Sequence, residues 1–158
     1  MGHPRRRAVT PRVAPLDGWR SACETAPMTE RQGACACGQL TVTCAGEPVR
    51  VSVCHCLECQ RRSGAPFAQQ ARWPAEAVTV HGNATTFQRV GDSGGAIAFR
   101  FCPVCGTTVC FEVDRMPGFL AVPVGVFADP TVPSPTYSIY EARKHRWVTV
   151  AGDVDHHD

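Results

Sequence analysis

The clustering of cysteines constrains this chain more than any other feature of its sequence. Ten cysteines occur in 158 residues, and seven of them lie in three short groups. The groups are ACACG with Cys35 and Cys37, VCHCLEC with Cys54, Cys56 and Cys59, and FCPVCG with Cys102 and Cys105. Cysteines this close in sequence are awkward disulfide partners, because a disulfide requires a specific Cα separation. They suit convergence on metal ions, and we expect zinc thiolates in a reducing, cytoplasmic compartment.

The group FCPVCG predicts a zinc knuckle, in which Cys102 and Cys105 flank a tight turn closed by glycine. Two ligands do not complete a tetrahedral site, so this pair needs a second pair from elsewhere in the chain. Cys35 and Cys37 form the remaining pair in a glycine-flanked turn. The sequence therefore predicts a structural four-cysteine zinc site that joins the start of the domain to a much later hairpin. Such a site contributes about 10 kcal/mol or more to folding.

The group VCHCLEC leaves Cys54, Cys56 and Cys59 with three thiolates and one open coordination position. A catalytic zinc has three protein ligands and an open fourth position, whereas a structural zinc has four. Zinc with three thiolates is suited to accept a further thiolate, and coordination lowers the pKa of the incoming thiol. The pattern therefore predicts an active site that holds a substrate thiolate beside an electrophile, and two zinc ions per chain in total.

A closed second site is the alternative, with His55, Cys44 or Cys110 as the fourth ligand. His55 lies between two ligands, and in an extended segment its ring points the other way. Cys44 falls in phase with the apolar residues of its strand, and Cys110 lies in the middle of another. Both are expected to be small buried apolar residues.

Arg61 and Arg62 follow the three-cysteine group directly. One interpretation is a solvated helical turn. The other is a cationic rim beside a negatively charged metal centre, able to bind a carboxylate of an acidic thiol. The second interpretation makes both arginines candidate substrate-binding residues.

Short β-strand patterns separated by turns fill the chain from Gly33 onward. Alternating residues are typical of half-buried strands in GQLTVTC, RVSVC and IAFRFC, each of which ends at a cysteine. Further candidates are AVTVHG, TTFQRV, VCFEV, FLAVPVGVF, SIYEAR and RWVTV, and Pro123 suggests an edge strand or a bulge. CLECQRRSG predicts a single helical turn. The predicted fold class is all-β, a twisted sheet sandwich or half-barrel with zinc knuckles at strand ends.

The first 27 residues differ from the rest. They contain five arginines and four prolines without sustained periodicity, so we expect a disordered or loosely attached extension before a zinc domain over residues 28–158. Outside the extension basic and acidic residues almost balance, which gives no electrostatic footprint for nucleic acid. No run approaches the roughly 18 apolar residues of a membrane span.

The ordered set GACACGQL, VCHCLECQRRSGAPF, FRFCPVCGTTV and SIYEARKHRWV resembles the family of glutathione-dependent formaldehyde-activating enzymes, also called the Gfa or CENP-V/GFA domain. The resemblance runs from about Gly33 to Val148. It implies an Mss4-like all-β fold with two zinc ions on the same two cysteine sets. It also implies a carbon–sulfur lyase-type reaction that joins formaldehyde to glutathione, or to a similar thiol, as an S-hydroxymethyl thiol.

One position departs from the family pattern. The C-terminal stretch of the family has a histidine in a pattern like P-x-x-H-I-[YFW], where PTYSIY has Ser138. If that histidine shapes the pocket, this chain differs in substrate or activity. The competing hypothesis is a non-catalytic, zinc-stapled Mss4-like module that binds other proteins.

Overall fold

The computed structural model describes residues 29–158, which form two β-sheets and one short α-helix. The predicted extension over residues 1–27 lies outside the described residues, and the domain boundary at Met28 stays a prediction. Across residues 29–158, none of the helices is long and apolar enough to cross a membrane.

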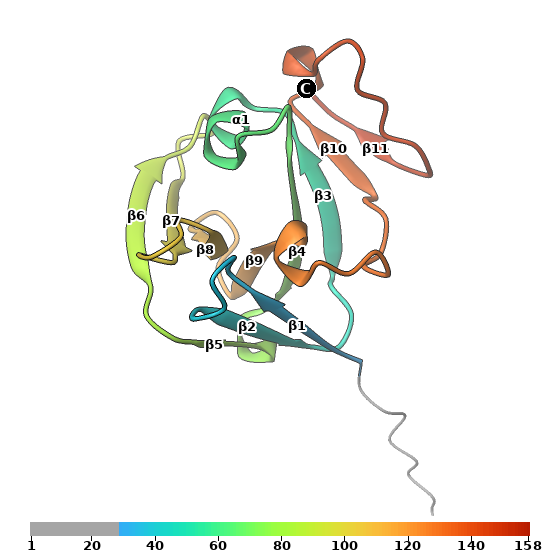
Figure 1. Cartoon of the computed structure of the whole chain (residues 1–158). Helices are drawn as coiled ribbons and strands as arrows, with labels where there is room; N and C mark the ends of the chain where they lie inside the picture. Colours follow the sequence, from blue (N-terminus) through green and yellow to red (C-terminus); the bar gives the residue numbers. More distant parts are fainter. Residues whose placement is uncertain (1–28) are drawn as a thin grey trace, which may run out of the picture.

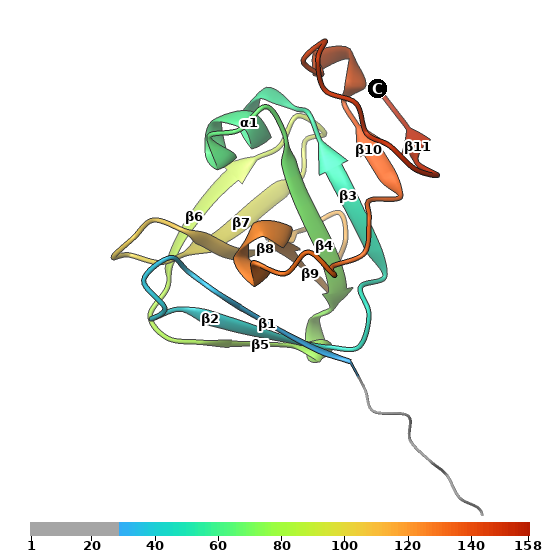
Figure 2. The ribbon, with the colours of Figure 1, turned by 45° about the vertical axis from the view of Figure 1, so that its right-hand side comes forward.

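The smaller sheet is antiparallel and has the strand order β1–β2–β5. Its strands are β1 (Glu30–Ala34), β2 (Thr41–Ala45) and β5 (Val78–His81). Figure 2 shows this sheet below the larger one. The turn between β1 and β2 carries Cys35 and Cys37, so the smaller sheet presents one of the predicted cysteine pairs.

The larger sheet has the strand order β11–β10–β3–β4–β9–β8–β7–β6. Its neighbours are antiparallel, except that β10 runs parallel to both β3 and β11. In chain order the strands are β3 (Arg50–Cys54), β4 (Ala68–Pro74), β6 (Thr85–Val90), β7 (Ala96–Phe101), β8 (Thr108–Val113), β9 (Phe119–Pro123), β10 (Tyr137–Ile139) and β11 (Asp155–His156). The helix α1 (Leu57–Ser63) connects β3 to β4. Three 3-10 turns follow β4, β9 and β10: η1 (Ala75–Ala77), η2 (Val124–Phe127) and η3 (Glu141–Arg143).

The larger sheet is strongly curved (Figure 1). β10 and β6 stand far apart in the strand order, yet Tyr137 of β10 and Arg89 of β6 line the same cavity. The sheet therefore wraps around this cavity as a half-barrel. The all-β, Mss4-like architecture predicted from the sequence, with twisted sheets and cysteine clusters at strand ends, is confirmed.

β3 and β4 give the larger sheet two chemically different faces. Side chains alternate across a strand, so Val51 of β3 and Trp73 of β4 pack into the core on one face. The residues between them face the cavity on the other: Arg50, Ser52, Gln70 and Arg72. This alternation places polar groups inside the half-barrel without interrupting the core.

The main core includes residues of both sheets. Leu40, just before β2, and Val42 and Cys44 in β2 are fully buried, in one cluster with Trp73 of β4. Trp73 donates its Nε1 hydrogen to the carbonyl oxygen of Gly46 over 3.0 Å, so its polar atom is satisfied. Burial of each such apolar side chain stabilises the fold by about 1.5–3 kcal/mol.

Two local predictions are wrong. RWVTV forms no strand, because residues 146–150 follow the η3 turn as loop. FLAVPVGVF forms a strand only as far as Pro123, and β9 is an interior strand rather than an edge. Pro123 is tolerated there because it is the last residue of β9, paired with Gln70 of β4 but beyond the part of β9 that pairs with β8.

Candidate metal centres and active site

The first cysteine cluster contains the two cysteine pairs that the sequence predicts to share one zinc site. The sulfur atoms of Cys35, Cys37, Cys102 and Cys105 all lie within 4.8 Å of one another. The Sγ atoms of Cys35 and Cys37 are 3.5 Å apart, and those of Cys37 and Cys102 are 3.6 Å apart. A tetrahedral zinc site with Zn–S bonds of about 2.3 Å has S···S edges of about 3.8 Å. The four sulfurs therefore fit one zinc ion.

The backbone forms a similar turn under each pair of this cluster. Cys35 N donates to Leu40 O over 2.8 Å, and Cys102 N donates to Thr107 O over 3.0 Å. Each turn is closed by a glycine with positive φ, 80° at Gly38 and 76° at Gly106. A side chain in this left-handed region is strained, so glycine is required for the turn that aims both sulfurs inward.

Nitrogen donors surround the sulfurs of the four-cysteine cluster. Gln39 donates from Nε2 to Cys102 Sγ over 2.8 Å, and Leu40 N donates to Cys35 Sγ over 3.3 Å. Val104 N donates to Cys102 Sγ over 3.4 Å. Donors of this kind stabilise negative charge on sulfur and orient the ligands of a metal. The cluster is thus built to hold thiolates.

The second cluster forms where β3 meets α1. Cys54 is the last residue of β3, Cys56 is the N-cap of α1, and Cys59 lies in the first turn of the helix. Their sulfur atoms lie within 4.8 Å of one another. Cys56 Sγ accepts a hydrogen bond from Cys59 N over 3.3 Å, which satisfies one of the free amides at the helix start.

Without metal, these three thiols share protons unequally. Hydrogen bonds from Cys54 and then Cys59 lower the pKa of Cys56 to about 2. The pKa of Cys54 is raised, because its thiol proton is held in the hydrogen bond to Cys56. Hydrogen bonds within the cluster therefore favour the thiolate form at Cys56.

The side chain of His55 does not point toward the cluster of Cys54, Cys56 and Cys59. Its side chain is fully buried, and Nε2 lies 3.2 Å from Ser138 Oγ on β10. Ser138 donates its hydroxyl hydrogen to Glu141 Oε1 over 2.6 Å, so the hydrogen between His55 and Ser138 is carried by Nε2. The ring points away from the cluster, as the extended segment predicts, and burial lowers the pKa of His55.

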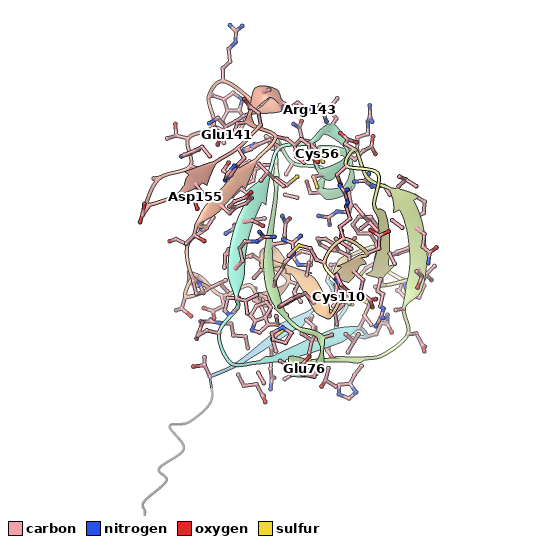
Figure 3. All side chains as sticks on the ribbon, turned by 180° about the vertical axis from the view of Figure 1, so that it is seen from behind. Cys56, Glu76, Cys110, Glu141, Arg143 and Asp155 are labelled. Carbon is pink, nitrogen blue, oxygen red and sulfur yellow. The ribbon has the colours of Figure 1, made fainter. Side chains whose placement is uncertain are left out.

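The other two candidates for a fourth ligand also lie elsewhere. Cys44 and Cys110 are fully buried in the main core. Figure 3 shows Cys56 at the end of the molecule near Glu141 and Arg143, while Cys110 lies well apart, toward the middle. Across residues 29–158, the cluster of Cys54, Cys56 and Cys59 has no fourth cysteine, histidine or carboxylate within reach.

The three cysteines open on a cavity of about 290 Å³ inside the half-barrel. Its walls combine apolar side chains with arginines, hydroxyls and an amide. Besides the cysteines, its lining includes Arg50, Ser52, Gln70, Arg72, Arg89, Asp92, Ile97, Phe111, Val113, Tyr137, Ile139 and Tyr140. Small-molecule sites commonly have this composition, a mainly apolar wall with a few placed polar groups.

Arg61 and Arg62 line a neighbouring hollow with Phe87 and Phe99 instead of this cavity. Arg61 is exposed and pairs with Glu58 one turn earlier on α1. The guanidinium carbon of Arg62 lies 5.3 Å from the ring centre of Phe99. Their role in substrate binding stays a prediction.

The arginines that do line the cysteine cavity were missed from the sequence. Arg50 could have been found, because Arg50, Ser52 and Cys54 alternate with Val51 and Val53 in RVSVC. Arg72 lies on β4, a strand that the sequence pattern does not predict. Arg89 reaches the cavity only through the curvature of the sheet.

Ser138 lies outside the cavity lining, while its neighbours Tyr137 and Ile139 belong to it. Ser138, at the position where the family resemblance predicts a histidine, therefore faces His55 behind the cysteines. Its hydroxyl contacts the residue between Cys54 and Cys56 and does not form part of the cavity wall.

Comparison with known proteins agrees with the motifs. A solved crystal structure of a Rhodobacter sphaeroides protein matches with 24% identity and a TM-score of 0.49, covering 60% of this chain and 85% of that one. No curated protein matches the chain. The family model described as "Glutathione-dependent formaldehyde-activating enzyme" matches residues 30–143. The chain belongs to this family, GFA.

Proposed function

We propose that this protein is a zinc-dependent enzyme that makes and breaks carbon–sulfur bonds in adducts of a thiol with a small aldehyde. Glutathione and formaldehyde are the substrates that the family description names. The observation that carries the proposal is the cluster of Cys54, Cys56 and Cys59, whose open side faces a cavity. A scaffold gains nothing from an incomplete tetrahedron, so this arrangement favours an enzyme over a purely structural module.

Two zinc ions fit the cysteine sets of this chain. Cys35, Cys37, Cys102 and Cys105 would hold the structural ion, and Cys54, Cys56 and Cys59 the catalytic one. When bound there, zinc supplies a coordination position that favours the thiolate form of a substrate thiol. The cytoplasmic location predicted from the cysteine pattern stays a prediction.

The reaction forms one carbon–sulfur bond. The thiol loses its S–H proton to solvent, a lone pair of the thiolate sulfur adds to the aldehyde carbon, the carbonyl π electrons move to oxygen, and that oxygen takes a proton to become the hydroxyl of the S-hydroxymethyl thiol. The apolar part of the wall, with Ile97, Phe111 and Val113, disfavours water, which competes with the thiol for the aldehyde.

Tyr140 is the proton donor that the cavity best offers. It lines the cavity beside the cysteines, and burial raises the pKa of its hydroxyl, so the group is protonated at neutral pH. Its backbone has φ 59°, a conformation rare for an aromatic residue. Strain of this kind concentrates at functional sites.

The proposal is tested by NMR exchange spectroscopy of formaldehyde and glutathione with the zinc-loaded protein. We expect faster interconversion of free and thiol-bound formaldehyde than in buffer. Cys56→Ser should abolish the acceleration, and Cys44→Ala, in the core, should keep it. A rate equal to that in buffer, with no thiol bound, would instead favour the binding-module hypothesis.

A further inference from the structure

Two arginines stand side by side at one end of the cysteine cavity. Arg50 on β3 pairs in register with Arg72 on β4, and both side chains line the cavity. Residues directly opposite on antiparallel strands have Cα atoms about 4.5–5.5 Å apart, and like charges in such a pair are destabilising. The pairing therefore calls for a compensating negative charge.

No protein carboxylate supplies that charge within residues 29–158. The ion pairs there leave out Arg50, Arg72 and Arg89. Asp92 also lines the cavity, but it pairs with Arg143. Burial, and then the nearby charge of Arg50, lower the pKa of Arg72 to about 10. Arg72 is thus largely withdrawn from water, and neither arginine has a carboxylate partner among residues 29–158: Arg50 lies 5.0 Å from the ring centre of Tyr137, and the nearby sulfurs of Cys54 and Cys59 act against the lowering at Arg72.

Two buried polar atoms near the arginines, one donor and one acceptor, also lack a hydrogen-bond partner among the described residues. Arg50 Nε is buried without a partner among the described residues, and so is Gln70 Oε1. Gln70 is only 3% exposed, and its Nε2 donates to Ser52 Oγ over 3.0 Å. Turning the amide lets the Ser52 hydroxyl donate to Oε1 and frees Nε2 as a donor. In either orientation a donor, Ser52 O–H or Gln70 N–H, remains for a ligand.

The spacing from this group to the cysteines suits a short ligand. Arg72 Nη1 lies 3.5 Å from Ser52 Oγ, so its guanidinium reaches the level of Ser52. Ser52 precedes Cys54 by two residues on the same face of β3, a distance of about 7 Å along the strand. One small molecule can span a guanidinium at Ser52 and the sulfurs at Cys54.

We propose that Arg50 and Arg72, with Ser52 and Gln70, form a carboxylate-binding subsite, so that the thiol substrate is one that carries a carboxylate a few bonds from its sulfur. This inference rests on the proposed function, because it assumes that the sulfur binds at the three cysteines. Arginine forks match carboxylates in geometry as well as in charge.

The test is calorimetric binding to the zinc-loaded protein of two thiols of matched length, mercaptopropionate and the neutral mercaptopropanol. The wild-type protein should bind the acid at least about tenfold more tightly, the value of one charged hydrogen bond. Arg50→Gln and Arg72→Gln should remove the preference without weakening mercaptopropanol, and Arg72→Lys should keep part of it. Arg100→Gln is the control, because Arg100 pairs with Glu112 outside the cavity lining. Zinc content and near-ultraviolet circular dichroism establish that each variant is folded.

The outcomes separate the two proposals. Equal affinity for both thiols overturns the subsite while thiol binding at the metal stands. If neither thiol binds, the proposed function fails, and binding of plain propionate that Arg72→Gln abolishes would still support a carboxylate subsite. If sulfate binds as tightly as mercaptopropionate, the site takes a free oxyanion and the substrate assignment is wrong.

Discussion

The imidazole of His55 and the hydroxyl of Ser138 are both fully buried, with Nε2 and Oγ 3.2 Å apart. The Ser138 hydroxyl donates a hydrogen bond to Glu141, whose carboxylate also accepts hydrogen bonds from Lys144 and His156. His55 stands between Cys54 and Cys56, so this chain of hydrogen bonds ties the C-terminal segment to the back of the three-cysteine cluster. Ser138, at the position where the resemblance predicts a histidine, thus supports the cluster from behind.

Ser138→Ala should therefore lower the free energy of unfolding by about 1–3 kcal/mol, because it leaves the buried Nε2–H of His55 without an acceptor. Ser134→Ala, at an exposed loop position, is the matched control. Urea denaturation measures both. Thiol binding by Ser138→Ala should match the wild type, and equal stability of the two variants would contradict the hydrogen-bond chain.

Glu141 should make stability depend on pH. Although burial acts in the opposite direction, hydrogen bonds from Lys144, Ser138 and His156 lower the pKa of Glu141 to about 2, from an ordinary value of 4.5. A carboxyl with a depressed pKa stabilises the folded state above its unfolded pKa, and that stability is lost as the pH falls from about 4.5 toward 2.

Glu141→Gln should accordingly be less stable than the wild type at pH 6, and the difference should shrink on acidification. Comparing the two proteins at each pH removes the contribution of the cysteine clusters, which both share. Urea midpoints across this range measure the difference. A gap that stays constant would show that Glu141 does not titrate with a lowered pKa.

Gln39 should control metal affinity at the four-cysteine cluster. Its Nε2 donates to Cys102 Sγ and also to Asn83 O over 2.9 Å, while its Oε1 accepts from Asn83 N. Loss of such an outer contact weakens metal binding about 10–100-fold. Gln39→Ala should show this loss in competition with a chelator, and Gln88→Ala, on the exposed strand β6, should not.

The two clusters should respond differently to loss of one sulfur. Cys102→Ser should remove one zinc per chain and unfold the domain, because Cys102 is fully buried where the turn after β7 meets the smaller sheet. Cys56→Ser should remove the other zinc and retain the fold. Metal analysis with far-ultraviolet circular dichroism checks both. Unfolding by Cys56→Ser would make that site structural.

Tyr140→Phe tests the proton donor. Removing the hydroxyl should slow adduct formation by about 100-fold or more, the usual value of general acid catalysis, and leave thiol binding intact. NMR exchange rates and calorimetry measure the two quantities separately. An unchanged rate would assign Tyr140 to the cavity wall alone.

The cysteine sets were predictable because their spacing fixes them locally. A C-x-x-C turn closed by Gly106 brings two sulfurs together whatever the rest of the chain does, and the remaining pair then follows by elimination. The orientation of His55 followed in the same way from strand alternation. Cys44 and Cys110 were correctly predicted as small core residues, since Cys44 falls in phase with the apolar residues of its strand and Cys110 lies in the middle of β8.

The cavity could not be predicted, because it depends on long-range pairing. Arg50 faces Arg72 only through the register of β3 against β4, and AQQARWP alternates too weakly to signal a strand. Arg89 of β6 lines the same cavity because the larger sheet is strongly curved. Arg61 and Arg62 are close to Cys59 in sequence, which suggested a shared site, whereas α1 directs them toward Phe87 and Phe99.

The most direct test is a crystal structure of the zinc-loaded protein grown with glutathione. The account predicts that the glutathione sulfur lies about 2.3 Å from a zinc ion held by Cys54, Cys56 and Cys59, as its fourth ligand. A fourth protein ligand on that zinc, or a glutathione sulfur bound away from it, would contradict the account.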